Sequence, residues 1–189
     1  MPERPAVLPD PPARPADWPR VAVFDIDGVL ADVRHRLHHV AARPKDWDAF
    51  FAAAPKDAAL PEGMAAVSAA QRAGDLVIYL TGRPERCRAD TLAWLAGQGL
   101  PPGDLFMRGD ADRRPARFTK VATLRRLARQ FRVEVFVDDD AAVVETVRAA
   151  GFPVLHATWM PAREPGAPAA PGPAAQAVLF DIQESDGRT

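Results

Sequence analysis

The sequence contains a single cysteine, Cys87, among its 189 residues. One thiol cannot form an internal disulfide or build a cysteine metal site, so we expect a reducing compartment, the cytoplasm. No apolar run approaches the ~18 residues that a membrane-spanning helix needs. The N-terminus is rich in proline and lacks the apolar stretch of a signal peptide. These absences together predict a protein that does not associate with membranes.

The net charge is small, and lysine is rare. The formal net charge is −1, so no global field attracts nucleic acid, and any polyanion has to be bound by a local patch. The 24 basic residues include only three lysines, namely Lys45, Lys56 and Lys120. In so arginine-rich a chain, a lysine inside a motif is more informative than an arginine. Hydrophobic residues make up 48% of the chain, which at this length predicts one globular domain with a sizeable core.

Proline divides the chain into segments. Seven of the 20 prolines fall in residues 1–19 and five in residues 161–173. Because proline lacks a backbone N–H and fixes φ, we predict a disordered tail over 1–19 and a linker over 161–173. Apolar spacing returns after the linker and predicts a short helix or tail over 174–189. The phosphate-loop pattern Gly-x-x-x-x-Gly-Lys-Ser/Thr is absent, so we expect no kinase half in this sequence.

Residues 20–160 form the predicted domain, in which strands alternate with helices. Short apolar runs predict strands at 21–24, 76–80, 105–107, 133–137 and 153–156. Helical patterns are expected at about 61–73, 85–98, 116–131 and 140–150. Val-rich and Ile-rich strands separated by helices predict an α/β fold, with a mainly parallel sheet covered on both faces.

Residues 31–60 are predicted to be a small, mainly helical insertion after the first strand. It looks too small to be a full closing cap, and an open crevice would admit an extended substrate. Its aromatic residues Trp47, Phe50 and Phe51 favour a local core that holds the insertion down, rather than a surface for base stacking.

Two carboxylates follow the first strand, in the run Phe24-Asp-Ile-Asp-Gly-Val-Leu30. Residues two apart on a strand project to the same side, so Asp25 and Asp27 are expected to share a face. Two bare carboxylates at that spacing repel, and a divalent cation such as Mg²⁺ would resolve the conflict. Gly28 then allows a sharp turn away from the sheet. The alternative is an ordinary Asp-Gly turn after a strand.

Two other predicted strands end in polar residues as well, and ligands of open α/β sheets bind beyond the carboxyl ends of the strands. Thr81 and Gly82 are predicted at a helix N-terminus, where they could hold phosphate oxygens or simply cap the helix. Asp138 and Asp139 could complete the Mg²⁺ site. Alternatively they cap the helix over 140–150, a role that Asp140 also suits.

Lys120 lies early in the predicted helix over 116–131. A lone helix lysine is most often a solvated surface residue. Its occurrence together with the three polar strand ends favours a functional role.

These motifs resemble, in order and relative placement, the four motifs of the haloacid dehalogenase superfamily. The resemblance implies a three-layer Rossmann-like fold with sheet order 5-4-1-2-3. It implies that Asp25 attacks phosphorus to form an aspartyl-phosphate, and that Asp27 protonates the leaving oxygen and then activates water. Thr81 and Lys120 would bind the phosphoryl oxygens. The metal ligands implied for Mg²⁺ are the Asp25 carboxylate, the Asp27 backbone carbonyl and an aspartate of the pair Asp138 and Asp139.

The sequence is more closely similar to the phosphatase domain of polynucleotide kinase–phosphatase and its stand-alone bacterial relatives. The run Asp25-Ile-Asp-Gly-Val-Leu-Ala-Asp-Val-Arg-His-Arg36 resembles that family's first motif, which implies that Arg36 contacts substrate. Tyr79-Leu-Thr-Gly-Arg83 resembles the second motif and implies a phosphate or nucleotide contact for Gly82 and Arg83. Ala116 stands where the family commonly has an aspartate. The implied activity is hydrolysis of phosphomonoesters on nucleotides or nucleic-acid ends.

Two further features of the sequence leave alternatives open. Arginines are frequent between Arg108 and Arg129; they could track a phosphate backbone, although a solvated helix face is favoured. For His35, His38 and His39, surface or substrate-adjacent roles are favoured over metal binding.

The functional alternatives are a phosphatase of small metabolites, a phosphotransferase or mutase, and a non-catalytic module that binds phosphate or nucleic acid. Two intact, mutually repelling carboxylates argue against the last of these, because a pure binding module has no use for them.

Overall fold

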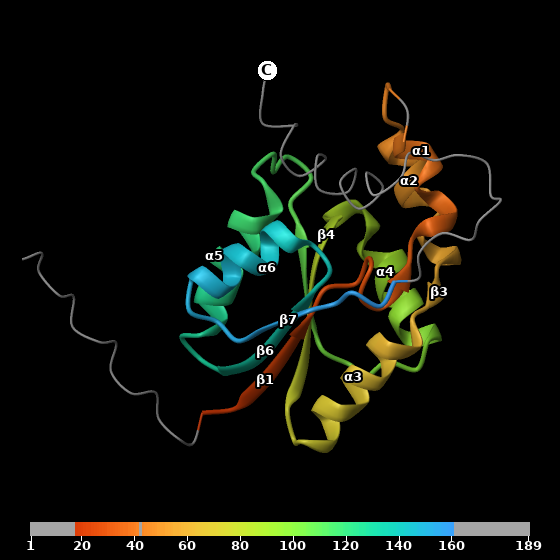
Figure 1. Cartoon of the computed structure of the whole chain (residues 1–189). Helices are drawn as coiled ribbons and strands as arrows, with labels where there is room; N and C mark the ends of the chain where they lie inside the picture. The colour runs from red at the N-terminus through yellow and green to blue at the C-terminus, as the bar shows by residue number, and fades with distance from the viewer. Residues whose placement is uncertain (1–17, 42, 161–189) are drawn as a thin grey trace, which may run out of the picture.

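The computed structural model describes residues 18–41 and 43–160 (Figure 1). Its central feature is a parallel sheet with strand order β5-β4-β1-β6-β7. The strands are β1 (Arg20–Phe24), β4 (Leu76–Pro84), β5 (Asp104–Arg108), β6 (Arg132–Asp138) and β7 (Val154–His156). If the five strands of this sheet are renumbered 1 to 5 in chain order, their order across the sheet, read from β7, is 5-4-1-2-3. This confirms the predicted order, with the first strand in the centre.

Helices cover both faces of the sheet, as predicted (Figure 1). The residues of β1 alternate between two cores: Ala22 and Phe24 belong to one, Val21 and Val23 to the other. The first core lies under α3 (Pro61–Arg72) and α4 (Arg88–Gly97), and the second under α5 (Ala116–Leu127) and α6 (Ala141–Ala149). Because a central strand is buried on both faces, β1 is apolar throughout its length after Arg20. The fold is therefore a three-layer α/β sandwich.

The insertion after β1 is a chain of short elements. A two-stranded antiparallel ladder joins β2 (Ala31–Asp32) to β3 (Ala58–Ala59) and closes its base. Between these strands lie the 3₁₀ helix η1 (Arg34–Arg36), α1 (His38–Ala41), α2 (Trp47–Ala52) and the 3₁₀ helix η2 (Ala54–Lys56).

Phe50 packs with Val33, Leu37 and Val40 in a separate small core, against which Trp47 and Phe51 also lie. The expected local core is thus confirmed.

Several predictions about the chain ends lie outside the described residues. The predicted linker over 161–173 and the predicted helix or tail over 174–189 are entirely outside them, and so are residues 1–17 of the predicted tail. Within the described part of the chain, no helix combines the length and apolarity needed to cross a bilayer.

Candidate active site

The candidate site lies at the carboxyl edge of the central strands, where parallel strands present their ends together. Asp25 directly follows β1, and its backbone N–H donates to Val137 O of β6 at 2.9 Å. Asp138 is the last residue of β6, and Thr81 lies in the second half of β4. The sheet therefore brings together side chains from three strands, as the sequence predicted.

Three buried aspartates form a compact acidic cluster. Ligand oxygens of Asp25, Asp138 and Asp139 all lie within 4.8 Å of one another. The ammonium of Lys120, on the second turn of α5, donates to Oδ2 of Asp25 and to Oδ2 of Asp138, at 2.7 Å each. Lys120 is only 2% exposed, so the alternative that it is a solvated surface residue is wrong. Asp140 caps α6 by accepting from two backbone N–H groups, as expected.

The electrostatics of this cluster leave negative charge unbalanced. Burial raises the pKa of Asp25 to about 6, against the opposing charge of Lys120. Burial and the neighbouring charges of Asp138 and Asp25 raise the pKa of Asp139 well above its usual range. Burial also raises the pKa of Asp138. For Lys120, burial works against its charge, but Asp138 and Asp25 outweigh burial and raise its pKa.

This donor set fits a divalent cation. The one ammonium pairs with two of the three carboxylates, those of Asp25 and Asp138, so two negative charges remain when all three are ionised. Hard oxygen donors of this kind suit Mg²⁺ or Ca²⁺, and a cation would remove the cost of burying the unpaired charges.

Gly28 is required by the turn that places these groups. Its φ is +76°, in the left-handed region that favours glycine. A Cβ at this position would lie 2.0 Å from Oδ2 of Asp139. The turn therefore needs glycine for its backbone conformation and for its closeness to the acidic cluster.

Asp27 points to a different set of partners from Asp25. Its Oδ1 accepts from Arg36 at 2.8 Å and from Nε of Arg83 at 2.9 Å. Burial opposes ionisation of Asp27, but the two guanidinium groups outweigh it and hold its pKa at about 2. The two arginines balance much of the charge of Asp27, although Asp27 still contributes to the raised pKa of Asp25. That a cation offsets the repulsion between the two carboxylates stays a prediction. The predicted metal contact of Asp27 through its backbone carbonyl stays a prediction.

Asp57 completes this second group, and sequence reasoning missed it. Its carboxylate accepts from Arg36 at 2.7 and 2.8 Å and from Arg83 at 2.8 Å, and His35 Nε2 lies 2.8 Å away. Its backbone carbonyl accepts from the indole N–H of Trp94. Asp57 follows η2 in the insertion, outside any recognisable motif. A usable signal would have been the need of two motif arginines for buried acidic partners.

Arg36 and Arg83 were predicted to contact substrate. Both are buried, at 0% and 1% exposure, and their side chains close on Asp27 and Asp57. The guanidinium of Arg36 also lies 4.1 Å from the ring centroid of Phe50. Both arginines therefore hold Asp27 in place, and the predicted substrate contact stays a prediction.

Thr81 and Gly82 are placed differently from the prediction. Strand β4 continues to Pro84, and α4 begins only at Arg88 after a 3₁₀ turn. The predicted helix N-terminus at Thr81 is therefore wrong. Thr81 is nevertheless buried at the site, and its hydroxyl accepts from the backbone N–H of Arg83 at 3.3 Å.

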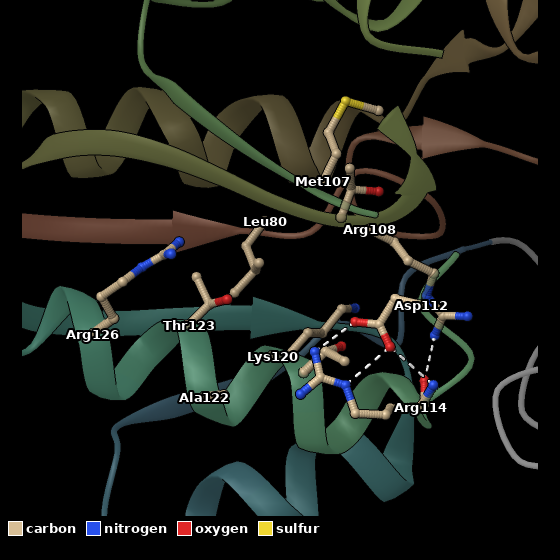
Figure 2. A pocket seen from close by; sticks show the side chains of 11 residues that line it. Leu80, Met107, Arg108, Asp112, Arg114, Lys120, Ala122, Thr123 and Arg126 are labelled. Atoms are coloured by element: carbon tan, nitrogen blue, oxygen red, sulfur yellow. Dashed lines mark hydrogen bonds and ion pairs between the residues drawn. The ribbon is translucent and has the colours of Figure 1, made fainter. Parts of the chain in front are cut away.

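A pocket of about 270 Å³ opens beside Thr81 and Lys120, between α5 and the ends of β4 and β5 (Figure 2). Four cationic side chains and one acidic side chain line it: Lys120, Arg108, Arg114, Arg126 and Asp112. The arginine-rich stretch is therefore split, since Arg113, Arg125 and Arg129 do not line this pocket.

The histidines take no part in the acidic cluster within residues 18–41 and 43–160. His35 contacts Asp57, and Nδ1 of His38 lies 2.9 Å from the backbone oxygen of His35. The surface or substrate-adjacent roles favoured for these histidines stay predictions.

Comparison with known families gives one match that covers most of the chain. Residues 19–158 match the model of the polynucleotide kinase PNKP phosphatase domain. No curated protein matches the sequence.

Solved structures share the fold at low sequence identity. A chain of the Pnkp1/Rnl/Hen1 RNA repair complex superposes with a TM-score of 0.64 and 24% identity, over 75% of this chain and 43% of that chain. The class C acid phosphatase of Bacillus anthracis, with tungstate bound, superposes with a TM-score of 0.55 and 16% identity, over 71% of this chain and 60% of that chain. CbbY from Rhodobacter sphaeroides, in complex with phosphate, superposes with a TM-score of 0.51 and 16% identity, over 85% of this chain and 99% of that chain. The chain thus spans less than half the length of the Pnkp1 complex chain that it matches.

Proposed function

The chain belongs to the family of polynucleotide kinase PNKP phosphatase domains, within the haloacid dehalogenase phosphatases, and from this premise we propose that it is a Mg²⁺-dependent phosphomonoester hydrolase with an aspartyl-phosphate intermediate. The observation that carries this proposal is the joint arrangement of Asp25, Lys120 and the Asp138–Asp139 pair in one buried cluster.

Asp25 is the proposed nucleophile. Its carboxylate oxygen attacks phosphorus, the bond to the leaving oxygen breaks, and the phosphoryl group becomes attached to Asp25. Phosphoryl transfer needs positioning and charge neutralisation more than covalent help from the protein. The ammonium of Lys120, the hydroxyl of Thr81 and the backbone N–H of Gly82 are proposed to hold the phosphoryl oxygens.

Asp27 is proposed to act as general acid and then as general base. Arg36 and Arg83 keep it ionised before substrate arrives, and the charge of an incoming phosphate raises the pKa of a nearby carboxylate. Asp27 can then take up a proton, from solvent or from a phosphomonoester monoanion, and donate it to the leaving oxygen. Once ionised again, it can take a proton from the water that attacks the aspartyl-phosphate and releases inorganic phosphate.

Asp25, Asp138, Asp139 and the backbone carbonyl of Asp27 would hold the metal. When bound, Mg²⁺ supplies charge neutralisation for the phosphoryl oxygens. The unbalanced negative charge of the three buried carboxylates supports this assignment.

The proposed substrates are phosphates on nucleotides or nucleic-acid ends. Support comes from membership of the PNKP phosphatase-domain family, from the likeness to a chain of an RNA repair complex and from the arginine-lined pocket beside Lys120. A small phosphorylated metabolite is the second candidate, because a pocket of about 270 Å³ is large enough for one.

We also keep residues 20–160 as the proposed catalytic domain and the cytoplasm as the proposed location, the latter supported by the lone Cys87.

The test is turnover of p-nitrophenyl phosphate in Mg²⁺ and in EDTA, followed by a comparison of natural substrates. We expect hydrolysis that depends on Mg²⁺, and a higher kcat/KM for a 3′-phosphorylated oligonucleotide than for a sugar phosphate. Binding of the oligonucleotide should weaken as salt rises. A preference for the sugar phosphate, with no effect of salt, would remove nucleic acid from the proposal and leave the phosphatase.

A further inference from the structure

The pocket beside Lys120 carries more positive charge than one phosphoryl group requires. The charge of Lys120 is already shared by Asp25 and Asp138, which lie 2.7 Å from its ammonium. Three arginines line the rest of the pocket. Arg114 is paired with the acidic residue of the wall, Asp112, and Arg108 donates to the backbone oxygen of Arg114 at 3.1 Å.

Arg126 stands out among these arginines. In residues 18–41 and 43–160 it makes no ion pair, and its guanidinium lies 5.0 Å from the ring centroid of Phe106. Stacking on an aromatic ring leaves the edge of a guanidinium free to donate hydrogen bonds to an anion. Figure 2 shows Arg126 on the opposite side of Lys120 from Arg108, Asp112 and Arg114.

Helix geometry sets the axial separation between Arg126 and Lys120. Arg126 follows Lys120 by six residues on α5, which corresponds to about 9 Å along the helix axis. Thr119, Thr123 and Arg126 recur at helical spacing and line the same pocket. The wall between Lys120 and Arg126 also includes the apolar side chains of Leu80 and Ala122.

We propose that Arg126 forms a second anion subsite, which binds a phosphate joined through a sugar to the phosphate being hydrolysed. The proposal rests on the proposed phosphatase function and specifies its substrate class as nucleotides with a second phosphate on the terminal sugar. The scissile phosphate lies at Lys120 and the sugar lies along Leu80. The second phosphate accepts hydrogen bonds from Arg126, because guanidinium groups bind phosphate oxygens in a bidentate manner.

A second phosphate can come from two sources. In a nucleic-acid strand it is the phosphodiester on the 5′ side of the terminal nucleoside, and in a free nucleotide it is the 5′-phosphate of a nucleoside 3′,5′-bisphosphate. The comparison therefore uses a 3′-phosphorylated dinucleotide, a nucleoside 3′,5′-bisphosphate and a nucleoside 3′-monophosphate. If the dinucleotide is the best substrate, the subsite serves strand ends; if the bisphosphate is, it serves free nucleotides. Both results support the subsite.

The experiment measures kcat/KM for these three substrates with the wild-type chain, Arg126→Ala and the control Arg125→Ala. Arg125 is the preceding residue, is exposed and does not line the pocket. We expect the wild type to prefer a substrate with two phosphates, and Arg126→Ala to reduce that preference about tenfold. For substrates with two phosphates, the slope of log affinity against log salt should also be smaller by about one counterion in Arg126→Ala than in the wild type. Arg125→Ala should change neither, and it should hydrolyse p-nitrophenyl phosphate at the wild-type rate.

Equal preference in the wild type and Arg126→Ala, with p-nitrophenyl phosphate still hydrolysed, would overturn the subsite and leave the phosphatase intact. Absence of any turnover by the wild type would instead overturn the proposed function. In that event, calorimetry measures binding of the bisphosphate to the same three proteins. Weaker binding by Arg126→Ala, with unchanged binding by Arg125→Ala, would support the subsite. Equal binding by all three proteins would contradict it.

Discussion

Lys120 donates a hydrogen bond of 2.7 Å to Asp25, although 95 positions separate the two residues in the sequence. The same ammonium reaches Asp138 and is almost fully buried. A compact ammonium fits between two carboxylates, whereas a planar guanidinium is larger and has a fixed donor geometry.

Lys120→Arg should therefore lose most of the phosphatase activity, even though positive charge is retained. The measurement is kcat for p-nitrophenyl phosphate, with circular dichroism to confirm folding. Lys56→Arg is the matched control, because Lys56 is exposed in the insertion, and it should retain the wild-type rate. A Lys120→Arg protein that keeps more than about half of the rate would contradict a role for Lys120 at the phosphoryl group.

Gly28 offers a test of the acidic cluster's geometry. Gly28→Ala should lose activity and Mg²⁺ binding, because the new Cβ would lie 2.0 Å from Asp139 Oδ2. Gly74→Ala is the control: its φ of +82° is equally left-handed, but nothing lies within 4 Å of its Cβ. The control should lose only about 1–2 kcal/mol of stability to backbone strain and keep full activity. Equal activity of the two variants would show that the turn at Gly28 is not needed for the site.

Asp57 and Asp48 provide a buried and an exposed version of the same ion pair with arginine. Asp57→Asn leaves Arg36 and Arg83 with one carboxylate, that of Asp27, instead of two, and should lower the free energy of unfolding by about 3 kcal/mol. The side chain of Asp48 is 90% exposed in its pair with Arg86, so Asp48→Asn should change stability by less than about 0.5 kcal/mol. Urea denaturation measures both. Similar losses in the two variants would contradict the assigned role of Asp57.

The raised pKa values of the acidic cluster predict an unusual dependence of stability on pH when no metal is bound. Because the pKa of Asp25 rises from 3.8 to about 6 on folding, the folded protein binds more protons at Asp25 than the unfolded chain does between these pH values. The raised pKa of Asp139 acts in the same direction. Stability in EDTA should therefore increase as pH falls from about 7 to about 5. The lowered pKa of Asp27 has the opposite effect on stability, but this effect falls between about pH 2 and pH 3.8.

Saturating Mg²⁺ should reverse this dependence, because the metal binds the ionised carboxylates and protons compete with it. The measurement is Tm against pH in EDTA and in Mg²⁺, with Asp139→Asn as the control that should reduce the slope in EDTA. A Tm that is the same in EDTA and Mg²⁺ at every pH would show that the cluster does not bind the metal.

The main elements of the site follow from the sequence because they depend on topology. The central position of β1 and the parallel strands bring the residues after β1 and β6 to one edge, which is why Asp25, Asp138 and Asp139 could be grouped in advance. The sheet order came from the resemblance to a known superfamily, since apolar runs alone do not specify which strands are neighbours.

The environment of Asp27 could not be predicted from spacing. Residues two apart share a face only while the chain is extended, and β1 ends at Phe24. The turn at Gly28 then reorients the chain, so the carboxylates of Asp25 and Asp27 meet different partners. Spacing does not identify Asp57 either, because the insertion that carries it is placed by contacts between residues distant in the sequence, such as those with Arg36 and Arg83. The need of these arginines for acidic partners indicates that such a residue exists, but not which one it is.

The most direct test of the central claim, that Asp25 is the nucleophile, is the turnover of p-nitrophenyl phosphate by Asp25→Asn in saturating Mg²⁺. The substitution preserves shape and removes the attacking carboxylate, so kcat should fall by at least ~10⁴-fold while Tm shows a folded protein. Asp27→Asn should also be disabled. An Asp25→Asn protein that hydrolyses the substrate at a rate close to that of the wild type would contradict the account.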